Sequence, residues 1–169
     1  MKKIDCYLEV LGILTNKDSE EVYEDSLDVK EKDELGDYLL NVACNLLQPE
    51  NVRFFIKKGA GLNTIGGEQN TPLITAIDNC HINPNAAYKI VEVLIENGAE
   101  IEKRGMFDKT PFLMACTRGC IEIIKLLVSK GCNIHATVEE FGEKDNGLNM
   151  AYTMNVDREC INYLKNLIK

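Results

Sequence analysis

The feature that most constrains this chain is a sequence repeat of about 33 residues. Ala43 and Ala76 are equivalent residues of two copies and lie 33 positions apart (76 − 43), and Gly98 and Gly131 are separated by the same number (131 − 98). A unit of this length is one small supersecondary element, which buries its apolar face only by stacking on its neighbours. The repeat therefore predicts a solenoid, a linear stack of similar units.

Each copy carries the sequence signals of two helices. The first helix begins with threonine followed by proline, at residues 71–72 and 110–111. The hydroxyl caps free N–H groups, and proline at the first helical position gives up no hydrogen bond. The second helix ends at a glycine, because glycine adopts the left-handed conformation without a steric penalty. The glycines at this position are Gly59, Gly98 and Gly131.

Together these signals resemble the ankyrin repeat family, whose pattern includes T-P-L-H-x-A with a period of 33 residues. Residues 71–76 (TPLITA) and 110–115 (TPFLMA) are the closest copies, and residues 38–43 (YLLNVA) and 146–151 (NGLNMA) are looser ones. The family's usual histidine is replaced by isoleucine and leucine in the two central copies. The resemblance implies an all-α fold, a solenoid of stacked helix–turn–helix units joined by extended, hairpin-like connectors.

We expect the repeats to cover residues 37–169, at about 37–69, 70–108, 109–144 and 145–169. Two departures from the period can be located. Ala76 and Gly98 are 22 positions apart where the next copy has 16, so six extra residues lie between the helices of the second copy, around residues 81–86. The connector that holds residues 138–145 is three residues longer than its neighbours. Insertions in a solenoid are expected in loops on one face.

The first 36 residues do not fit the repeat and are strongly acidic. Between Asp18 and Asp37, ten acidic residues outnumber Lys30 and Lys32, so this segment carries −8, which equals the net charge of the whole chain. Apolar residues at helical spacing predict one helix over about residues 3–14 and a second, acidic one near residues 22–27. We interpret residues 1–36 as an acidic helical N-terminal cap on the stack. An acidic, partly disordered interaction tail is the alternative.

Composition narrows the class of protein. No basic stripe of the kind that binds phosphate backbones is visible, which argues against nucleic acid as a ligand. No stretch of about 18 uncharged residues predicts a membrane span. The chain has seven cysteines, an odd number, in a length that needs no disulfide bonds for stability, and no export signal precedes them. We therefore expect reduced cysteines and a cytoplasmic protein that is a monomer.

Two groups of residues carry side chains capable of catalysis or metal binding. Cys80 and His81 are adjacent, but neighbouring loop residues rarely face each other as a nucleophile and its base must. Cys116, Cys120, Cys132 and His135 have a spacing that superficially suits tetrahedral zinc. The repeat explains these cysteines better as small apolar residues at ordinary repeat positions. We therefore expect no enzyme activity, no metal and no cofactor.

The leading prediction is a non-catalytic protein-interaction module that binds a partner protein through its concave face and connector tips. Large apolar side chains in connectors gain nothing from the main core, and methionines on the inner helices could extend them into an adaptable apolar strip. The predicted contact residues are Met106, Phe107, Asp108, Met114, Thr117, Arg118, Phe141, Met150 and Met154. The sequence does not identify the partner.

Three alternatives stay open at this point. A narrower version of the binding hypothesis is an inhibitor or immunity-type protein that neutralises a basic partner through the acidic segment from Asp18 to Asp37, with salt-sensitive association. A second class is a cysteine- or metal-dependent protein. A third is a structural subunit that associates with copies of itself through the ends of the solenoid.

Overall fold

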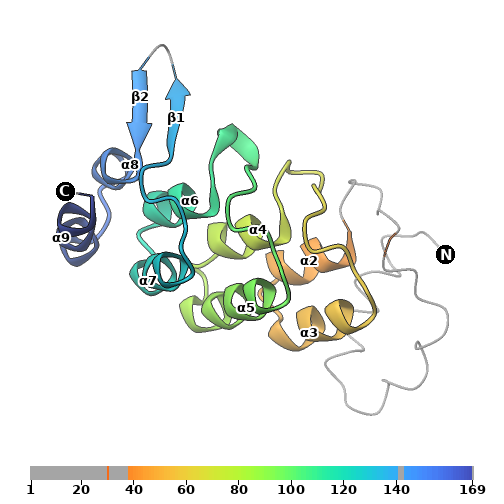
Figure 1. Ribbon diagram of the computed structural model, residues 1–169. Coiled ribbons are helices and arrows are strands. Elements are labelled where there is room, and N and C mark those ends of the chain that lie inside the picture. The colour runs from red at the N-terminus through yellow and green to blue at the C-terminus, as the bar shows by residue number, and fades with distance from the viewer. Residues whose placement is uncertain (1–29, 31–37, 141–142, 169) are drawn as a thin grey trace.

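The computed structural model describes residue 30 and residues 38–140 and 143–168. In these residues the chain forms eight α-helices in four consecutive pairs, each pair folded as a helical hairpin (Figure 1). The helices are α2 (Leu39–Asn45), α3 (Pro49–Lys57), α4 (Pro72–Asp78), α5 (Pro84–Glu96), α6 (Pro111–Arg118), α7 (Ile121–Ser129), α8 (Gly147–Thr153) and α9 (Arg158–Leu167). The predicted N-terminal cap and its two helices lie outside the described residues, apart from Lys30.

The helix pairs stack side by side into two parallel rows (Figure 1). The first helices of the pairs, α2, α4, α6 and α8, contact one another in order and form the inner row, while α3, α5, α7 and α9 form the outer row. Each helix also packs against the other member of its own pair. The predicted all-α ankyrin-type solenoid is therefore confirmed. In the described part of the chain, no helix is long and apolar enough to cross a membrane.

The helix boundaries follow the predicted capping signals. The Thr71 hydroxyl accepts a hydrogen bond from the N–H of Ile74 at 3.2 Å, and the Thr110 hydroxyl accepts one from Leu113 at 3.3 Å. In the last pair, the side chain of Asn146 takes over this role for the N–H groups of the first turn of α8. The three predicted glycines follow the ends of the outer helices with φ between 83° and 96°, in the left-handed region. The sequence signals thus fix both ends of the two central repeat units.

The core is one continuous apolar cluster that runs along the stack. The central inner helices, α4 and α6, are covered on both sides by neighbouring pairs, so that every residue of α6 from Pro111 to Thr117 is buried. The outer helices bury one stripe only: α7 buries Ile123, Ile124, Leu126 and Leu127 and exposes Glu122. Side chains on the central inner helices are therefore covered from two sides, and this covering limits which of them can reach a partner.

The six extra residues of the second pair are divided between a loop and a helix. The loop between α4 and α5 spans residues 79–83, whereas α6 and α7 are joined by residues 119–120 alone. Helix α5 has 13 residues against nine in α7, and α4 has seven against eight in α6. Relative to the third pair, the loop is therefore three residues longer, α5 is four residues longer and α4 is one residue shorter, which accounts for the six extra residues. The insertion lengthens an outer helix by about one turn, which we had not expected.

The connectors leave the stack on one side and differ in length. The first two span residues 58–71 and 97–110, and each narrows to a turn closed by a backbone hydrogen bond, Gly66 N–H to Asn70 O and Gly105 N–H to Lys109 O. The third, residues 130–146, contains an antiparallel hairpin of β1 (Thr137–Glu140) and β2 (Glu143–Asn146) that projects from the solenoid (Figure 1). The three additional residues predicted for this connector extend its hairpin.

The structure corrects the expectation that every cysteine is reduced. Cys80, in the loop between α4 and α5, is joined by a disulfide bond to Cys120 in the turn between α6 and α7, with the two Cα atoms 6.8 Å apart. The expectation rested on composition, and it could not show that the enlarged α4–α5 loop brings these two turns together. In the described part of the chain, four other cysteines are free and buried: Cys44, Cys116, Cys132 and Cys160.

Candidate protein-interaction surface

The second connector presents an aromatic side chain to solvent in an unusual backbone conformation. Its tip is a single 3₁₀ turn, Met106–Asp108, in which Phe107 has φ 57° and ψ 30°, in the left-handed region that non-glycine residues avoid. The Phe107 side chain is 62% exposed, and the ammonium group of Lys109 lies 5.8 Å from the centre of its ring. The connector thus holds a large apolar group away from the core.

A single arginine holds this tip in place. The guanidinium of Arg104 forms an ion pair with the Asp108 carboxylate at 2.9 Å and also donates to the Asp108 carbonyl oxygen. The same guanidinium donates from both terminal nitrogens, at 3.2 Å, to the carbonyl oxygen of Thr137 in β1. Arg104 therefore closes the turn that contains Phe107 and ties it to the base of the third connector.

The hairpin beside this turn carries charges of both signs. Its register places Glu139 opposite Lys144 and Val138 opposite Asp145. Val138 is buried, whereas Glu139 and Lys144 are exposed. Opposite charges across a hairpin stabilise it modestly. We name residues 104–109 together with residues 137–140 and 143–146 the tip surface.

A buried amide network supports the connectors from below. The Asn41 amide of α2 donates to the carbonyl oxygen of Asn70 at 3.1 Å, and the Asn70 side-chain oxygen accepts from the N–H of Met106 at 3.0 Å. Asn70 is 1% exposed. Because buried polar groups need their partners, this network fixes the first and second connectors relative to the first helix pair.

The predicted contact residues fall into three groups. Five lie at the surface or are half-buried: Met106, Phe107, Asp108, Arg118 and Met154. Of these, Met106, Phe107 and Asp108 belong to the tip surface. Met154 lies after α8 and is 51% exposed. Phe141 lies outside the described residues. Met114, Thr117 and Met150 are buried.

The predicted apolar strip of inner-helix methionines is therefore corrected. Met114 is 3% exposed and Met150 is 6% exposed. The reason is the packing of α6 against α8: the Thr117 hydroxyl donates to the Leu113 carbonyl oxygen and lies 3.5 Å from the sulfur of Met150, inside the seam between the third and fourth pairs. These three side chains hold repeats together and do not form a surface.

Arg118 is exposed but already paired. Its guanidinium contacts the Asp78 carboxylate at 2.7 and 2.8 Å, across the seam between α4 and α6. Asn79 makes the corresponding link in the preceding seam, since its amide donates to the Asn45 side-chain oxygen at 2.9 Å. Both links lie at the ends of the inner helices that are remote from the connectors.

Sequence reasoning missed Arg104, although a signal was present. Arg104 and Thr137 are 33 residues apart, one repeat length, as are Thr117 and Met150. In a stacked repeat, residues one period apart occupy equivalent places in adjacent units and lie side by side. The period therefore places Arg104 beside residue 137, but the acceptor is a backbone carbonyl oxygen, which the sequence does not distinguish from any other.

Of the two groups with side chains capable of catalysis or metal binding, neither is assembled as a nucleophile with its base or as a tetrahedral metal site. Cys80 is in the disulfide bond, and Nδ1 of His81 lies 3.2 Å from the Asp78 carbonyl oxygen. Cys120 is bonded to Cys80 and so is not a thiolate ligand beside Cys116, Cys132 or His135. Across residues 38–140 and 143–168, no three His, Cys, Asp or Glu side chains are grouped so that they could hold a metal ion.

Comparison with known families decides the classification. A family profile described as ankyrin repeats in three copies matches residues 9–105, and a single ankyrin repeat profile matches residues 107–136. The chain belongs to the ankyrin repeat family. Ankyrin repeats are generally modules of protein–protein interaction, and the family is generally non-enzymatic.

Curated relatives with ankyrin repeats come from bacteria and viruses. The chain is 34% identical over 116 residues, 69% of its length, to a putative ankyrin repeat protein of Rickettsia bellii (strain RML369-C), of which the match covers 34%. It is 28% identical over 97 residues, 56% of its length, to ankyrin repeat protein T5 of rabbit fibroma virus (strain Kasza), covering 19% of it. It is 25% identical over 101 residues, 58% of its length, to ankyrin repeat domain-containing protein M-T5 of myxoma virus (strain Lausanne), covering 20% of that protein. The chain thus spans between a fifth and a third of these ankyrin relatives.

Proposed function

We propose that this ankyrin repeat chain is a non-catalytic, cytoplasmic interaction module whose partner protein contacts the tip surface, with Phe107 at the centre of the contact. The observation that carries the proposal is the combination of exposure and strain at Phe107, which is 62% exposed at φ 57°. A left-handed conformation costs a non-glycine residue about 1–2 kcal/mol. Strain of this kind persists where the surrounding structure imposes it, and it is concentrated at functional sites.

The energetics favour burial of this side chain by a partner. An aromatic side chain buries roughly 150–250 Å² in total, so covering the exposed part of Phe107 removes about 100 Å² from water. At about 25 cal/mol per Å² this corresponds to roughly 2–3 kcal/mol. Aromatic residues in the centre of an interface, surrounded by polar groups, commonly carry much of the binding free energy. Arg104, Asp108 and Lys109 provide that polar surround for Phe107.

Pre-organisation strengthens the proposal. The Arg104 hydrogen bonds to Thr137 fix the turn before a partner arrives, so little conformational entropy is lost when Phe107 is covered. The narrower hypothesis, an inhibitor of a basic partner, rests on the acidic segment from Asp18 to Asp37. Apart from Lys30, that segment lies outside the described residues, and the narrower hypothesis stays a prediction.

The test compares two substitutions at matched exposed apolar residues. Phe107 is 62% exposed in a connector, and Ile82 is 65% exposed in the α4–α5 loop, at the opposite ends of the helices. Wild type, Phe107→Ser and Ile82→Ser are used to capture proteins from native lysate, after circular dichroism shows that each is folded. A captured partner is then purified and its Kd measured with each variant.

We expect a partner that Phe107→Ser fails to capture and Ile82→Ser still captures. The Kd of Phe107→Ser for this partner should be weakened roughly 30- to 150-fold, which is 2–3 kcal/mol. Equal binding by all three proteins would exclude the tip surface as the contact. Loss with Ile82→Ser alone would move the contact to the opposite edge of the solenoid.

A further inference from the structure

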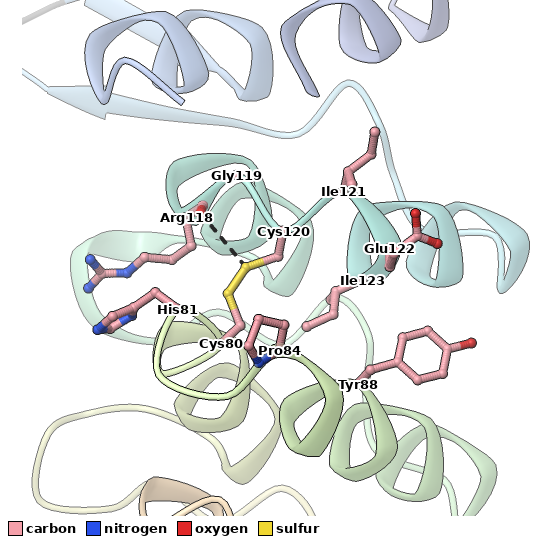
Figure 2. A pocket seen from close by; sticks show the side chains of 10 residues that line it. All are labelled: Cys80, His81, Pro84, Tyr88, Arg118, Gly119, Cys120, Ile121, Glu122 and Ile123. Atoms are coloured by element: carbon pink, nitrogen blue, oxygen red, sulfur yellow. Dashed lines mark hydrogen bonds between the residues drawn. A yellow bond between two sulfur atoms is a disulfide. The ribbon is translucent and has the colours of Figure 1, made fainter. Parts of the chain in front are cut away.

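A second feature lies at the edge of the solenoid opposite the connectors. A hollow of about 240 Å³ opens between the second and third helix pairs, directly over the disulfide bond (Figure 2). Its walls are mostly apolar and come from the first turns of the two outer helices, Pro84 and Tyr88 of α5 and Ile121 and Ile123 of α7. Figure 2 shows the Cys80–Cys120 bond between these walls and the side chains of His81 and Arg118.

The two sulfur-bearing residues are not equally accessible. Both residues line the hollow, but Cys80 is 2% exposed whereas Cys120 is only half-buried. A thiol entering the hollow therefore reaches the Cys120 sulfur first. In thiol–disulfide exchange, access decides which of the two sulfurs is attacked.

The surroundings of Cys120 suit a thiolate. Cys120 is the N-cap residue of α7, a nine-residue helix, and no side chain caps the first N–H groups of this helix. Free N–H groups and the helix dipole stabilise negative charge at a helix N-terminus, a known setting for reactive cysteines. Its sulfur lies 3.8 Å from the Arg118 carbonyl oxygen, whereas the Arg118 guanidinium is directed away from the bond and pairs with Asp78 (Figure 2).

The other described cysteines lack these properties. Cys44 and Cys116 are fully buried, and burial raises the pKa of both thiols far above the ordinary value. Burial raises the pKa of Cys132 to about 12 and that of Cys160 to about 11. Because the thiolate is the reactive form, these four residues are inert, and among the described cysteines exchange chemistry is confined to the pair that borders the hollow.

We propose that the Cys80–Cys120 bond is a reversible thiol-exchange site, opened by a small thiol such as glutathione that enters the hollow and attacks Cys120. In the first step the thiolate of the small molecule forms a bond to the Cys120 sulfur, and Cys80 leaves as a thiolate that takes a proton from solvent. A second thiolate then attacks the sulfur of the bound small molecule, and Cys120 leaves. The protein disulfide gains two electrons, and two small thiols become one disulfide.

Opening the bond acts on one seam of the solenoid. The bond links the α4–α5 loop to the α6–α7 turn, and the Asp78–Arg118 ion pair crosses the same seam. In a repeat protein, stability depends on the contacts between neighbouring units, so removal of one covalent link loosens the second pair against the third. The oxidised form is the rigid form and the reduced form the looser one.

The experiment uses the full chain in glutathione buffers that range from fully reducing to fully oxidising. After acid quench and alkylation, mass spectrometry counts the free cysteines and locates them. The expected result is a reversible step of two alkylated cysteines, with Cys80 and Cys120 protected under oxidising conditions and all seven cysteines alkylated after reduction and unfolding. Amide hydrogen exchange in α4 and α6 should be faster in the reduced form.

Two single variants identify the attacked sulfur. Cys80→Ser should form a glutathione adduct on Cys120 at least ten times faster than Cys120→Ser forms one on Cys80. If a variant does not fold, the transient glutathione adduct of the wild-type chain, trapped during reduction, supplies the same information and should map to Cys120. No protected pair in any buffer, a bond that persists in folded protein under excess reduced glutathione, or an adduct that maps to Cys80 would each overturn the proposal.

Discussion

The guanidinium of Arg104 and the carbonyl oxygen of Thr137, 33 residues further along the chain, are joined by two hydrogen bonds of 3.2 Å. The donor belongs to the second connector and the acceptor to the first strand of the third. Since Arg104 also holds Asp108, one planar cation sets the position of the turn that presents Phe107. The tip surface is therefore a property of two adjacent repeats and not of one.

Arg104→Lys tests this relationship. An ammonium group is a compact charge and cannot reproduce the planar fork that serves both Asp108 and Thr137. We expect the Kd for the partner to weaken about 3- to 10-fold, with a change in the free energy of unfolding below about 1 kcal/mol because the pair is exposed. Isothermal titration calorimetry and urea unfolding measure the two quantities.

A double-mutant cycle with Phe107→Ala separates positioning from direct contact. If Arg104 acts by placing Phe107, the lysine substitution costs little once the ring has been removed, and the two effects are less than additive. An undiminished cost in the Phe107→Ala background would contradict the positioning role and make Arg104 an independent contact.

Gly98→Ala should destabilise the protein through the backbone alone. Gly98 has φ 96°, and a Cβ atom built there would meet no heavy atom within 4 Å. The cost is therefore conformational, and we expect about 1–2 kcal/mol in urea unfolding. Gly98→Asn is the matched control and should cost less, since asparagine tolerates positive φ better than alanine. Equal costs would show that a steric contact is responsible.

The repeat period allowed most of the fold to be predicted, because the signals that end each helix are local. The cap at Thr110 and the turn at Gly131 depend on side chains and φ angles within a few residues, and both were predicted from the sequence. The extra turn of α5 was missed although its signal is local: Asn83 caps the helix by accepting from the N–H of Ala86, and Pro84 occupies the first helical position.

The candidate site was predicted less well, because exposure is set by neighbouring repeats. Phe107 was identified correctly as an exposed side chain, since a connector residue has no repeat stacked over it. The helical positions of Met114 and Met150 predicted that both side chains lie on the concave face of the solenoid. The adjacent inner helices cover them instead. The Cys80–Cys120 bond depends on where the insertion places the α4–α5 loop, which periodicity does not show.

Oxidation of Cys80 and Cys120 should raise the thermal midpoint. The bond closes a loop of 40 residues, and the loss of loop entropy in the unfolded chain corresponds to about 4 kcal/mol. For a chain of this size we expect the midpoint of the oxidised form to exceed that of the reduced form by roughly 10 °C. Differential scanning calorimetry with and without reductant measures the shift. The double variant Cys80→Ser/Cys120→Ser should show none, and a similar shift in that variant would assign the effect to other cysteines.

The buried thiols predict a loss of stability in mild alkali. Burial raises the pKa of the Cys160 thiol from 9.0 to about 11, and that of Cys132 from 9.0 to about 12. Above pH 9 the unfolded chain therefore releases thiol protons that the folded chain retains, and the free energy of unfolding falls as pH rises. Each such thiol contributes a slope of up to about 1.4 kcal/mol per pH unit, while below the unfolded pKa the thiols contribute no pH dependence.

Cys160→Ser removes one of these groups without adding a titrating one. Urea unfolding between pH 8 and pH 10 should show a shallower decline for the variant than for wild type, by up to about 1.4 kcal/mol per pH unit near pH 10. The variant also loses some stability at every pH, because Cys160 is 1% exposed and serine packs less well in its place. This loss does not change with pH, so it does not affect the comparison of slopes. Parallel declines in the two proteins would mean that Cys160 ionises as readily in the folded chain as in the unfolded one, and hence that solvent reaches its sulfur.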